Sequence, residues 1–260
     1  MNDRNSGMAQ RPYIVGNWKM NGTRAMLSEA RAIDRAAQRN MKVEVALAPP
    51  FTLIHAVHRE VEQIGVGAQD CHPGEDGAHT GDVSATMLAD AGAKFVILGH
   101  SERRNGHNEN NELVRAKAEA ALSAGMRVIM CCGESASERG KGGAEDFVLA
   151  QLRASLPQVE NASERLTVAY EPIWAIGTGN NATPEDIGAM HTAIRGLMVE
   201  LYGLDEGTEI RILYGGSVKP ENARELLSAA EVGGALIGGA SLAADSFMGI
   251  ALAIADAPEG

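Results

Sequence analysis

Short apolar stretches recur along the chain, and each is followed by a segment in which apolar residues return every three or four positions. The alternation occurs eight times. Most of the stretches are apolar throughout. This is typical of a parallel sheet covered on both faces, because a sheet with one wet face would alternate. We therefore predict strands over residues 13–17, 43–47, 66–69, 95–98, 127–131, 166–170, 210–214 and 235–237.

The segments between these strands carry signals for the beginning and the end of helices. Thr183 suits an N-cap, and Pro184 with the acidic pair after it suits a first turn at the positive end of a helix dipole. Gly125 and Gly203 follow helical segments and are predicted to end them. The helix after Thr183 has one apolar stripe, formed by Ile187, Met190, Ile194, Leu197 and Leu201.

Eight strand–helix units within about 250 residues predict a closed (β/α)8 barrel of the α/β class, since an open doubly wound sheet usually has fewer strands. No linker or low-complexity tract divides the chain, so we expect a single domain over 1–260. Residues 1–11 are polar and are expected to be a flexible N-terminal extension. In such a barrel the residues directly after each strand carry the chemistry.

Charge and composition narrow the range of functions. The chain has 23 Lys and Arg against 34 Asp and Glu, and this net charge of -11 argues against nucleic-acid or anionic-membrane partners. No apolar stretch approaches the ~20 residues of a membrane-spanning helix, and the first eleven residues lack the apolar core of a secretion signal. We therefore expect a cytoplasmic protein. The three cysteines lack both zinc spacing and an even number for disulfides.

Polar residues that could carry chemistry follow three of the predicted strands. Asn17 and Lys19 follow the first strand and alternate with an apolar residue, so they point to the same side of an extended chain. His100 follows the fourth strand before a predicted helix start, whose positive end would keep the imidazole neutral. Glu171 ends the sixth strand, where a carboxylate is costly unless it is solvated or used. Glu102 either pairs with Lys19 or stays solvated.

Two further patterns suit a phosphorylated substrate. The segment after Glu171 is apolar but bounded by Pro172 and by Gly177, which fits either a buried connection or a hinged flap that excludes water. Glycine pairs at 215–216 and 238–239 follow strands seven and eight, where backbone N–H groups and a helix N-terminus hold phosphate in such barrels. The chain contains neither a Walker loop nor a dinucleotide fingerprint, so no nucleotide cofactor is expected.

Four sequence blocks resemble the triosephosphate isomerase family: GNWKMN at 16–21, GHSERR at 99–104, AYEPIWAIGTG at 169–179 and YGGS at 214–217. The resemblance spans nearly the whole chain. It implies interconversion of dihydroxyacetone phosphate and glyceraldehyde 3-phosphate through an enediolate, without a cofactor. It assigns Glu171 as the base and His100 as the neutral electrophile. Lys19 and Asn17 would stabilise the oxyanion and bind the anionic substrate.

The same resemblance implies further roles. Residues 69–84 resemble the family's interface loop, so a homodimer with His79 and Thr80 in the interface is expected. His79, Asp82 and Asp70 stand where the family commonly has phenylalanine, glutamate and asparagine. Gly177, Ser217, Gly238 and Gly239 would form the phosphate cradle. The closing lid would comprise Pro172, Ile173, Trp174, Ala175, Ile176, Gly177 and Thr178.

Several alternatives stay open at this point. A relative with the same mechanism could act on a four-carbon ketose phosphate such as erythrulose phosphate, and a barrel could bind phosphates without catalysis. A phosphate-barrel synthase would lack the lid and the interface loop. The Asp70, Cys71, His72 and His79 group could be imagined as a metal site, but the family loop explains these residues without metal, and no metal is expected.

Overall fold

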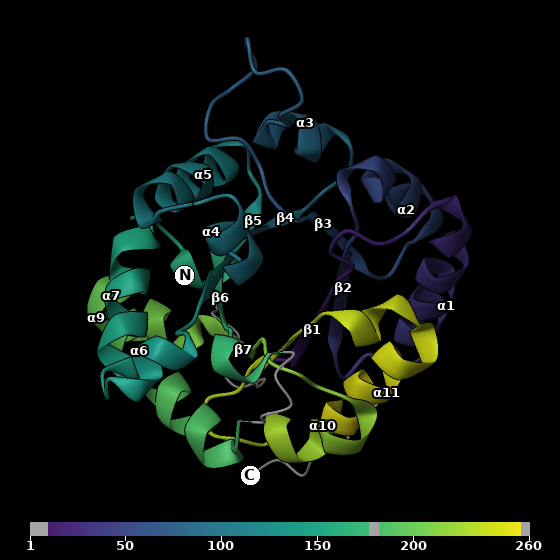
Figure 1. The fold of residues 1–260 in the computed structure, drawn as a ribbon. Coiled ribbons are helices and arrows are strands. Elements are labelled where there is room, and N and C mark those ends of the chain that lie inside the picture. Colours follow the sequence, from purple (N-terminus) through teal and green to yellow (C-terminus); the bar gives the residue numbers. More distant parts are fainter. Residues whose placement is uncertain (1–9, 177–181, 256–260) are drawn as a thin grey trace, which may run out of the picture.

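The computed structural model describes residues 10–176 and 182–255, in which eight parallel strands form a closed barrel in chain order. The first strand pairs with both the second and the eighth, which closes the ring that Figure 1 shows along its axis. The (β/α)8 fold predicted from the sequence is thus confirmed. The strands are β1 (Tyr13–Asn17), β2 (Glu44–Ala48), β3 (Gly65–Ala68), β4 (Phe95–Leu98), β5 (Arg127–Cys132), β6 (Leu166–Tyr170), β7 (Arg211–Tyr214) and β8 (Gly234–Ile237).

Helices surround the barrel on its outside (Figure 1). Short 3-10 turns lie before α1 and α2 and after β6 and β8 at Arg24–Met26, Phe51–Leu53, Ile173–Ala175 and Gly239–Leu242. The α-helices are α1 (Leu27–Gln38), α2 (Ile54–Glu60), α3 (Ala85–Asp90), α4 (Ser101–Gly106), α5 (Asn111–Ser123), α6 (Ala136–Gly140), α7 (Ala144–Ser155), α8 (Ala162–Arg165), α9 (Pro184–Glu209), α10 (Pro220–Leu227) and α11 (Ala244–Ala255).

Both faces of the strands are buried, which explains why their sequences are apolar throughout. Alternate strand residues point outward to the helices, and the others fill the barrel interior. Phe95 lies across the interior, and a Cβ at Gly67 would lie 2.4 Å from its ring, so only glycine leaves room for it. The interior cluster consists of Tyr13, Val15, Ala46, Ala48, Phe95, Ile97, Ile129, Cys131, Ala169, Leu213 and Leu236.

Five of the predicted strand ranges differ from the observed strands, three by one residue at one end and two by one residue at both ends. The seventh strand, for example, starts at Arg211 and not at 210, because the Ile210 N–H still bonds the Glu206 carbonyl of α9. Strand ends depend on pairing with neighbours, which the hydrophobic pattern does not record. The ranges at 13–17, 95–98 and 166–170 are confirmed.

Helix α9 begins at the predicted N-cap and is interrupted at Gly203, where the sequence predicts a stop. The Thr183 side chain caps the Asp186 N–H, and the Asp186 carboxylate accepts from the Thr183 N–H, which forms a capping box. Gly203 has a non-helical backbone with a φ of 82° and a ψ of 168°, so the first helix of α9 ends there, and a second short helix follows up to Glu209. Gly207 lets this second helix approach the first, because a Cβ there would lie 2.5 Å from the Val199 backbone. Gly125 does follow the end of α5, with a φ of 78°.

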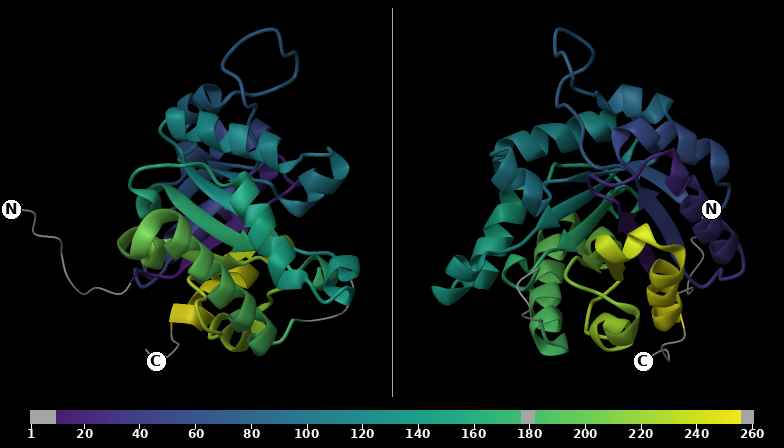
Figure 2. Two further views of the ribbon diagram at one scale, coloured as in Figure 1. Left: turned by 90° about the vertical axis from the view of Figure 1, so that its left-hand side faces the viewer. Right: turned by 45° about the vertical axis from the view of Figure 1, so that its right-hand side comes forward.

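The connection from β3 to α3 projects away from the barrel, as both views in Figure 2 show. Residues 75–82 of this loop are exposed, whereas Cys71 and Ser84 at its two ends are buried. Among the described residues, no helix is both long and apolar enough to cross a bilayer.

Candidate active site

Side chains from several strand ends meet in one cavity of about 410 Å³ at the carboxyl end of the barrel. All four residues predicted to act in catalysis line it, together with three of the four predicted cradle residues. Gly177, the fourth, and Thr178 of the predicted lid lie outside the described residues. The lining comprises Asn17, Lys19, His100, Glu171, Ile176, Gly215, Gly216, Ser217, Val218, Lys219, Leu236, Gly238, Gly239 and Ala240.

Glu171 is a buried carboxylate at the end of β6, with 1% of its surface exposed. Its Oε2 accepts the Ser101 backbone N–H at 3.0 Å, and its Oε1 accepts the Ser101 hydroxyl at 2.9 Å. The His100 Nε2 lies 3.1 Å from the same Oε1. Hydrogen bonds to the ionised form compensate for the cost of burying a carboxylate. Ser101 was not singled out from the sequence, although it directly follows His100.

His100 stands at the N-cap of α4, and its ring orientation indicates a neutral imidazole. The Glu102 backbone N–H donates to His100 Nδ1 at 3.2 Å. A nitrogen that accepts this bond carries no proton, so the single ring proton lies on Nε2, which faces Glu171. The geometry thus agrees with the neutral histidine expected from the sequence.

Lys19 adopts a left-handed backbone conformation that is uncommon for a side chain of this type, with a φ of 52°. Such a conformation costs about 1–3 kcal/mol and persists only where its surroundings hold it. Here the Lys19 N–H donates to Asn17 Oδ1 at 3.0 Å, and the Lys19 carbonyl accepts from Gln69 Nε2 at 3.0 Å. Asn17 and Gln69 therefore fix the lysine backbone. The contribution of Gln69, from a strand end 50 residues away, was not visible in the sequence.

The ammonium group of Lys19 reaches two parts of the site. It bonds Glu102 Oε1 at 2.6 Å, which decides between the two alternatives left open for Glu102. It also lies 3.7 Å from the position that a Cβ would take at Gly238. Lys219 lines the cavity as well. An acidic chain thus presents two cations to a cavity beside the glycines of β8, which suits an anionic ligand.

Glycines bring the backbone close to the cavity. A Cβ at Gly215 would lie 3.0 Å from Glu171 Cγ, and one at Gly216 would lie 2.1 Å from the Tyr214 hydroxyl. Gly238 and Gly239 lead into a 3-10 turn, whose start is held by the Ser241 N–H and hydroxyl on the Gly238 carbonyl. Backbone N–H groups at such a turn can receive a phosphate.

The described part of the predicted lid runs from Pro172 to Ile176 and is anchored at Trp174. The indole N–H of Trp174 donates to Glu134 Oε1 at 2.8 Å, and the Tyr170 hydroxyl donates to the same oxygen at 3.0 Å. The Arg139 guanidinium lies over the indole ring, 4.3 Å from its centroid. Burial, followed by the charge of Glu134, raises the pKa of Tyr170. Glu134 is fully buried, and sequence inspection did not identify it.

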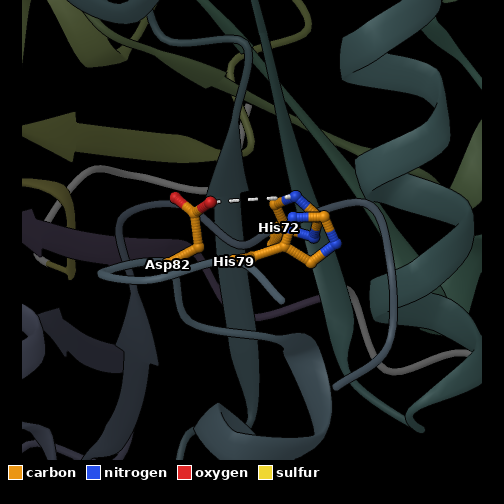
Figure 3. Close-up of side chains that lie close together, drawn as sticks. All are labelled: His72, His79 and Asp82. Atoms are coloured by element: carbon orange, nitrogen blue, oxygen red, sulfur yellow. Dashed lines mark ion pairs between the residues drawn. The ribbon is translucent and has the colours of Figure 1, made fainter. Parts of the chain in front are cut away.

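The projecting loop brings two histidines and one carboxylate together (Figure 3). The centroids of the His72 and His79 rings lie 4.1 Å apart with the rings tilted by 36°, and His72 Nε2 lies 3.8 Å from Asp82 Oδ2. His72 Nδ1 accepts the Gly74 N–H at 3.0 Å, so a neutral His72 carries its proton on Nε2, toward Asp82. A metal-bound Nε2 would require the opposite tautomer. The arrangement therefore fits an imidazole–carboxylate pair.

Asp70, at the base of this loop, belongs to a buried ring of alternating charges and not to the histidine group. Lys117 Nζ lies 2.8 Å from Asp70 Oδ1 and 2.6 Å from Glu109 Oε1. Arg103 closes the ring, 2.7 Å from Asp70 and 2.8 Å from Glu109. Burial raises the pKa of Asp70 despite Lys117, whereas for Glu109 the two cations outweigh burial and lower the pKa. The ring joins the loop base to α4, which carries the candidate site.

Nearly the whole chain is similar to known proteins of one family. Residues 12–254 match the family model of triosephosphate isomerase. The chain is 52% identical over 247 residues to the triosephosphate isomerase of Xanthobacter flavus, covering 94% of this chain and 98% of that protein. It is 51% identical over 252 residues to that of Caulobacter vibrioides, covering 96% and 99%. The fold is similar to a crystal structure of triosephosphate isomerase from Bartonella henselae, with a TM-score of 0.87, 45% identity and coverage of 94% and 99%.

Proposed function

The chain belongs to the triosephosphate isomerase family, and we propose that the cavity at the carboxyl end of its barrel interconverts dihydroxyacetone phosphate and D-glyceraldehyde 3-phosphate. The enzyme is an aldose–ketose isomerase, as family membership implies. One observation carries the assignment of the site. A buried carboxylate lies 3.1 Å from the protonated nitrogen of a neutral imidazole, in a cavity whose other side is formed by glycines and Lys19.

The reaction moves one proton between neighbouring carbons, so it is redox-neutral and needs a base, an oxyanion donor and no cofactor. Glu171 takes a proton from C1 of dihydroxyacetone phosphate, and the electrons form a C1–C2 enediolate. Glu171 then returns the proton to C2, while the oxygen proton moves from O1 to O2 and leaves a C1 aldehyde. A positioned base contributes about 10²- to 10⁴-fold in rate.

His100 and Lys19 act on the oxygens. The Nε2–H of His100 donates to the substrate oxygen on which negative charge develops, and it relays the proton between the two oxygens. The Lys19 ammonium neutralises both that oxyanion and the phosphate, and its distance of 3.7 Å from a Cβ position at Gly238 supports this double role. Asn17 holds the Lys19 N–H in place.

The phosphate end is assigned to Gly238, Gly239, Ser217 and, by resemblance, Gly177. Their backbone N–H groups would hold the dianion in the plane of the enediolate. The lid residues 172–178 would exclude water. Both effects matter, because an enediolate phosphate that is free to rotate expels its phosphate by elimination.

We also propose that the protein forms a homodimer through the projecting loop. A second cavity of about 280 Å³ adjoins the active site and is lined by Met20, Gln69, Glu102 and His107 as well as by Lys19. Met20 is 96% exposed, and the loop residues His79 and Thr80 are exposed too. The exposed loop of one subunit could fill the second cavity of its partner, and the partner's loop could fill the cavity of the first, which is a reciprocal contact around a two-fold axis. A cytoplasmic location and a single domain remain predictions from the sequence.

The test compares initial rates of the wild-type protein and of Glu171→Gln on D-glyceraldehyde 3-phosphate. The amide keeps the shape of the side chain and removes the base, so we expect kcat to fall by at least about 10³-fold while a phosphate-bearing inhibitor still binds. Glu225→Gln, an exposed change on α10, is the matched control and should retain the wild-type rate. Wild-type turnover in Glu171→Gln would contradict the proposal.

A further inference from the structure

The floor of the active-site cavity is formed by Leu236. It lies on β8, is 4% exposed and belongs to the interior cluster of the barrel. The other apolar residues of the cavity lining, among those that the structure describes, come from outside the strands. They are Ile176 after the 3-10 turn of the lid, Val218 before α10 and Ala240 in the turn after β8. Leu236 is therefore the apolar side chain that separates the cavity from the packed interior.

The floor lies on β8, and the cradle glycines Gly238 and Gly239 directly follow that strand. Gly238 follows Leu236 by two residues, which places their Cα atoms about 6 to 7 Å apart along an extended chain. Each further carbon lengthens an extended substrate by about 1.3 Å, as follows from the C–C bond length and angle. One additional carbon thus adds about a fifth of the distance between cradle and floor.

From this juxtaposition we propose that Leu236 limits the carbon chain of the substrate to three atoms. The inference rests on the proposed function. With the phosphate held at Gly238, C1 and C2 of a triose lie between Glu171 and His100. In a four-carbon ketose phosphate, C1 and C2 lie one carbon further from the phosphate. The additional carbon then needs the space that the Leu236 methyl groups occupy.

The other walls of the cavity cannot yield as easily. Asn17, Lys19, His100 and Glu171 are needed for the reaction. Gly215 and Gly216 present backbone that packs against Glu171 and the Tyr214 hydroxyl. Among the apolar lining residues, Leu236 is the one that belongs to the barrel interior, and shortening it opens space there without changing the reacting groups. An apolar pocket discriminates by about 10- to 200-fold for a single methylene, which sets the expected scale.

The experiment measures kcat/KM of the full chain for D-glyceraldehyde 3-phosphate and for D-erythrose 4-phosphate. The wild type is expected to prefer the triose by at least about 10²-fold. Leu236→Ala should lower this preference at least about 10-fold, Leu236→Val should lower it less, and Leu236→Met, which keeps the volume, should preserve it. Val218→Ala, at the outer wall, is the matched control and should change both substrates by the same factor.

The outcomes separate this inference from the proposed function. No Glu171-dependent rate on the triose would refute the isomerase site itself. An active wild type whose preference is unchanged, within two-fold, in Leu236→Ala and Leu236→Val would refute only the role of Leu236. A wild type that prefers the tetrose would refute it too. So would a Val218→Ala variant whose preference for the triose falls as much as that of Leu236→Ala. If Leu236→Ala does not fold, the triose preference of Leu236→Val is compared with that of Leu236→Met instead.

Discussion

Gly133, between β5 and α6, holds no catalytic group, yet it determines where Glu171 can lie. A Cβ at Gly133 would lie 1.8 Å from the Glu171 carbonyl oxygen, whereas real Cβ contacts are never shorter than 3.0 Å. Gly133→Ala must therefore separate the two backbones by at least about 1.2 Å. The segment has little freedom to relax, because the Glu171 N–H bonds the Cys132 carbonyl at 2.7 Å and the Gly133 N–H bonds Gln151 Oε1 at 2.9 Å.

A displacement of about 1 Å at a reacting group can cost about 10²-fold in rate. We expect Gly133→Ala to lower kcat on glyceraldehyde 3-phosphate by about this factor. KM should change little, because Ser217, Gly238 and Gly239 of the phosphate cradle follow β7 and β8 and do not touch Gly133. The overpacking should cost about 1–3 kcal/mol of stability. The assays are steady-state kinetics and thermal unfolding by circular dichroism.

The matched control is Gly196→Ala, on an exposed turn of α9 where an added Cβ meets no atom within 4 Å. Alanine is the better helix former, so this variant should keep its activity and gain up to about 1 kcal/mol. A Gly133→Ala protein with wild-type kcat would refute the steric argument. Loss of activity in both variants would show that the assay reports stability and not geometry.

Three further predictions follow from the site, the core and the loop. Lys19→Met removes the ammonium group beside Gly238 and should lower kcat/KM by about 10²- to 10³-fold, and an unchanged value would contradict its role. Burial lowers the pKa of His191 to about 4, so the unfolded chain binds more protons than the native one between pH 6.5 and pH 4. The contribution of His191 to the free energy of unfolding should therefore fall as the pH falls through this window, by about 2 kcal/mol from pH 7 to pH 5 at fixed protein concentration. His191→Gln should lose this part of the pH dependence, and a pH profile identical to that of the wild type would contradict the prediction. Thr80→Arg should weaken dimers and activity together, and an active monomer in sedimentation velocity would contradict the proposed interface.

The barrel could be predicted because the burial of each strand is visible in the residues of that strand alone. Each strand is buried on both faces, so its residues are apolar in succession, and eight such stretches within one chain leave few alternatives. Gly203 does break α9 as the sequence predicts, but the short helix after it could not be predicted. That helix folds back and packs Gly207 onto the first one, where Arg195 bonds the Gly207 carbonyl, and this contact is tertiary.

In the candidate site, the reacting residues could be predicted from the sequence, but the residues that hold them in place could not. Asn17, Lys19, His100 and Glu171 stand directly after strands, where the fold places chemistry, so the sequence could point to them. Their supports could not be found, because the contacts cross long stretches of chain. Ser101 bonds a carboxylate 70 residues away, Gln69 bonds a carbonyl 50 residues away, and Glu134 bonds Trp174 over 40 residues.

The central claim is that Glu171 moves a proton between C1 and C2 through an enediolate. Isomerisation of D-glyceraldehyde 3-phosphate in D2O, followed by NMR, tests it most directly. A proton held on a carboxylate exchanges with solvent, so the wild-type protein should form dihydroxyacetone phosphate with deuterium at C1. Glu171→Gln should lose both the turnover and the label. Rapid formation of product without deuterium, or a labelled product at the wild-type rate from Glu171→Gln, would contradict the account.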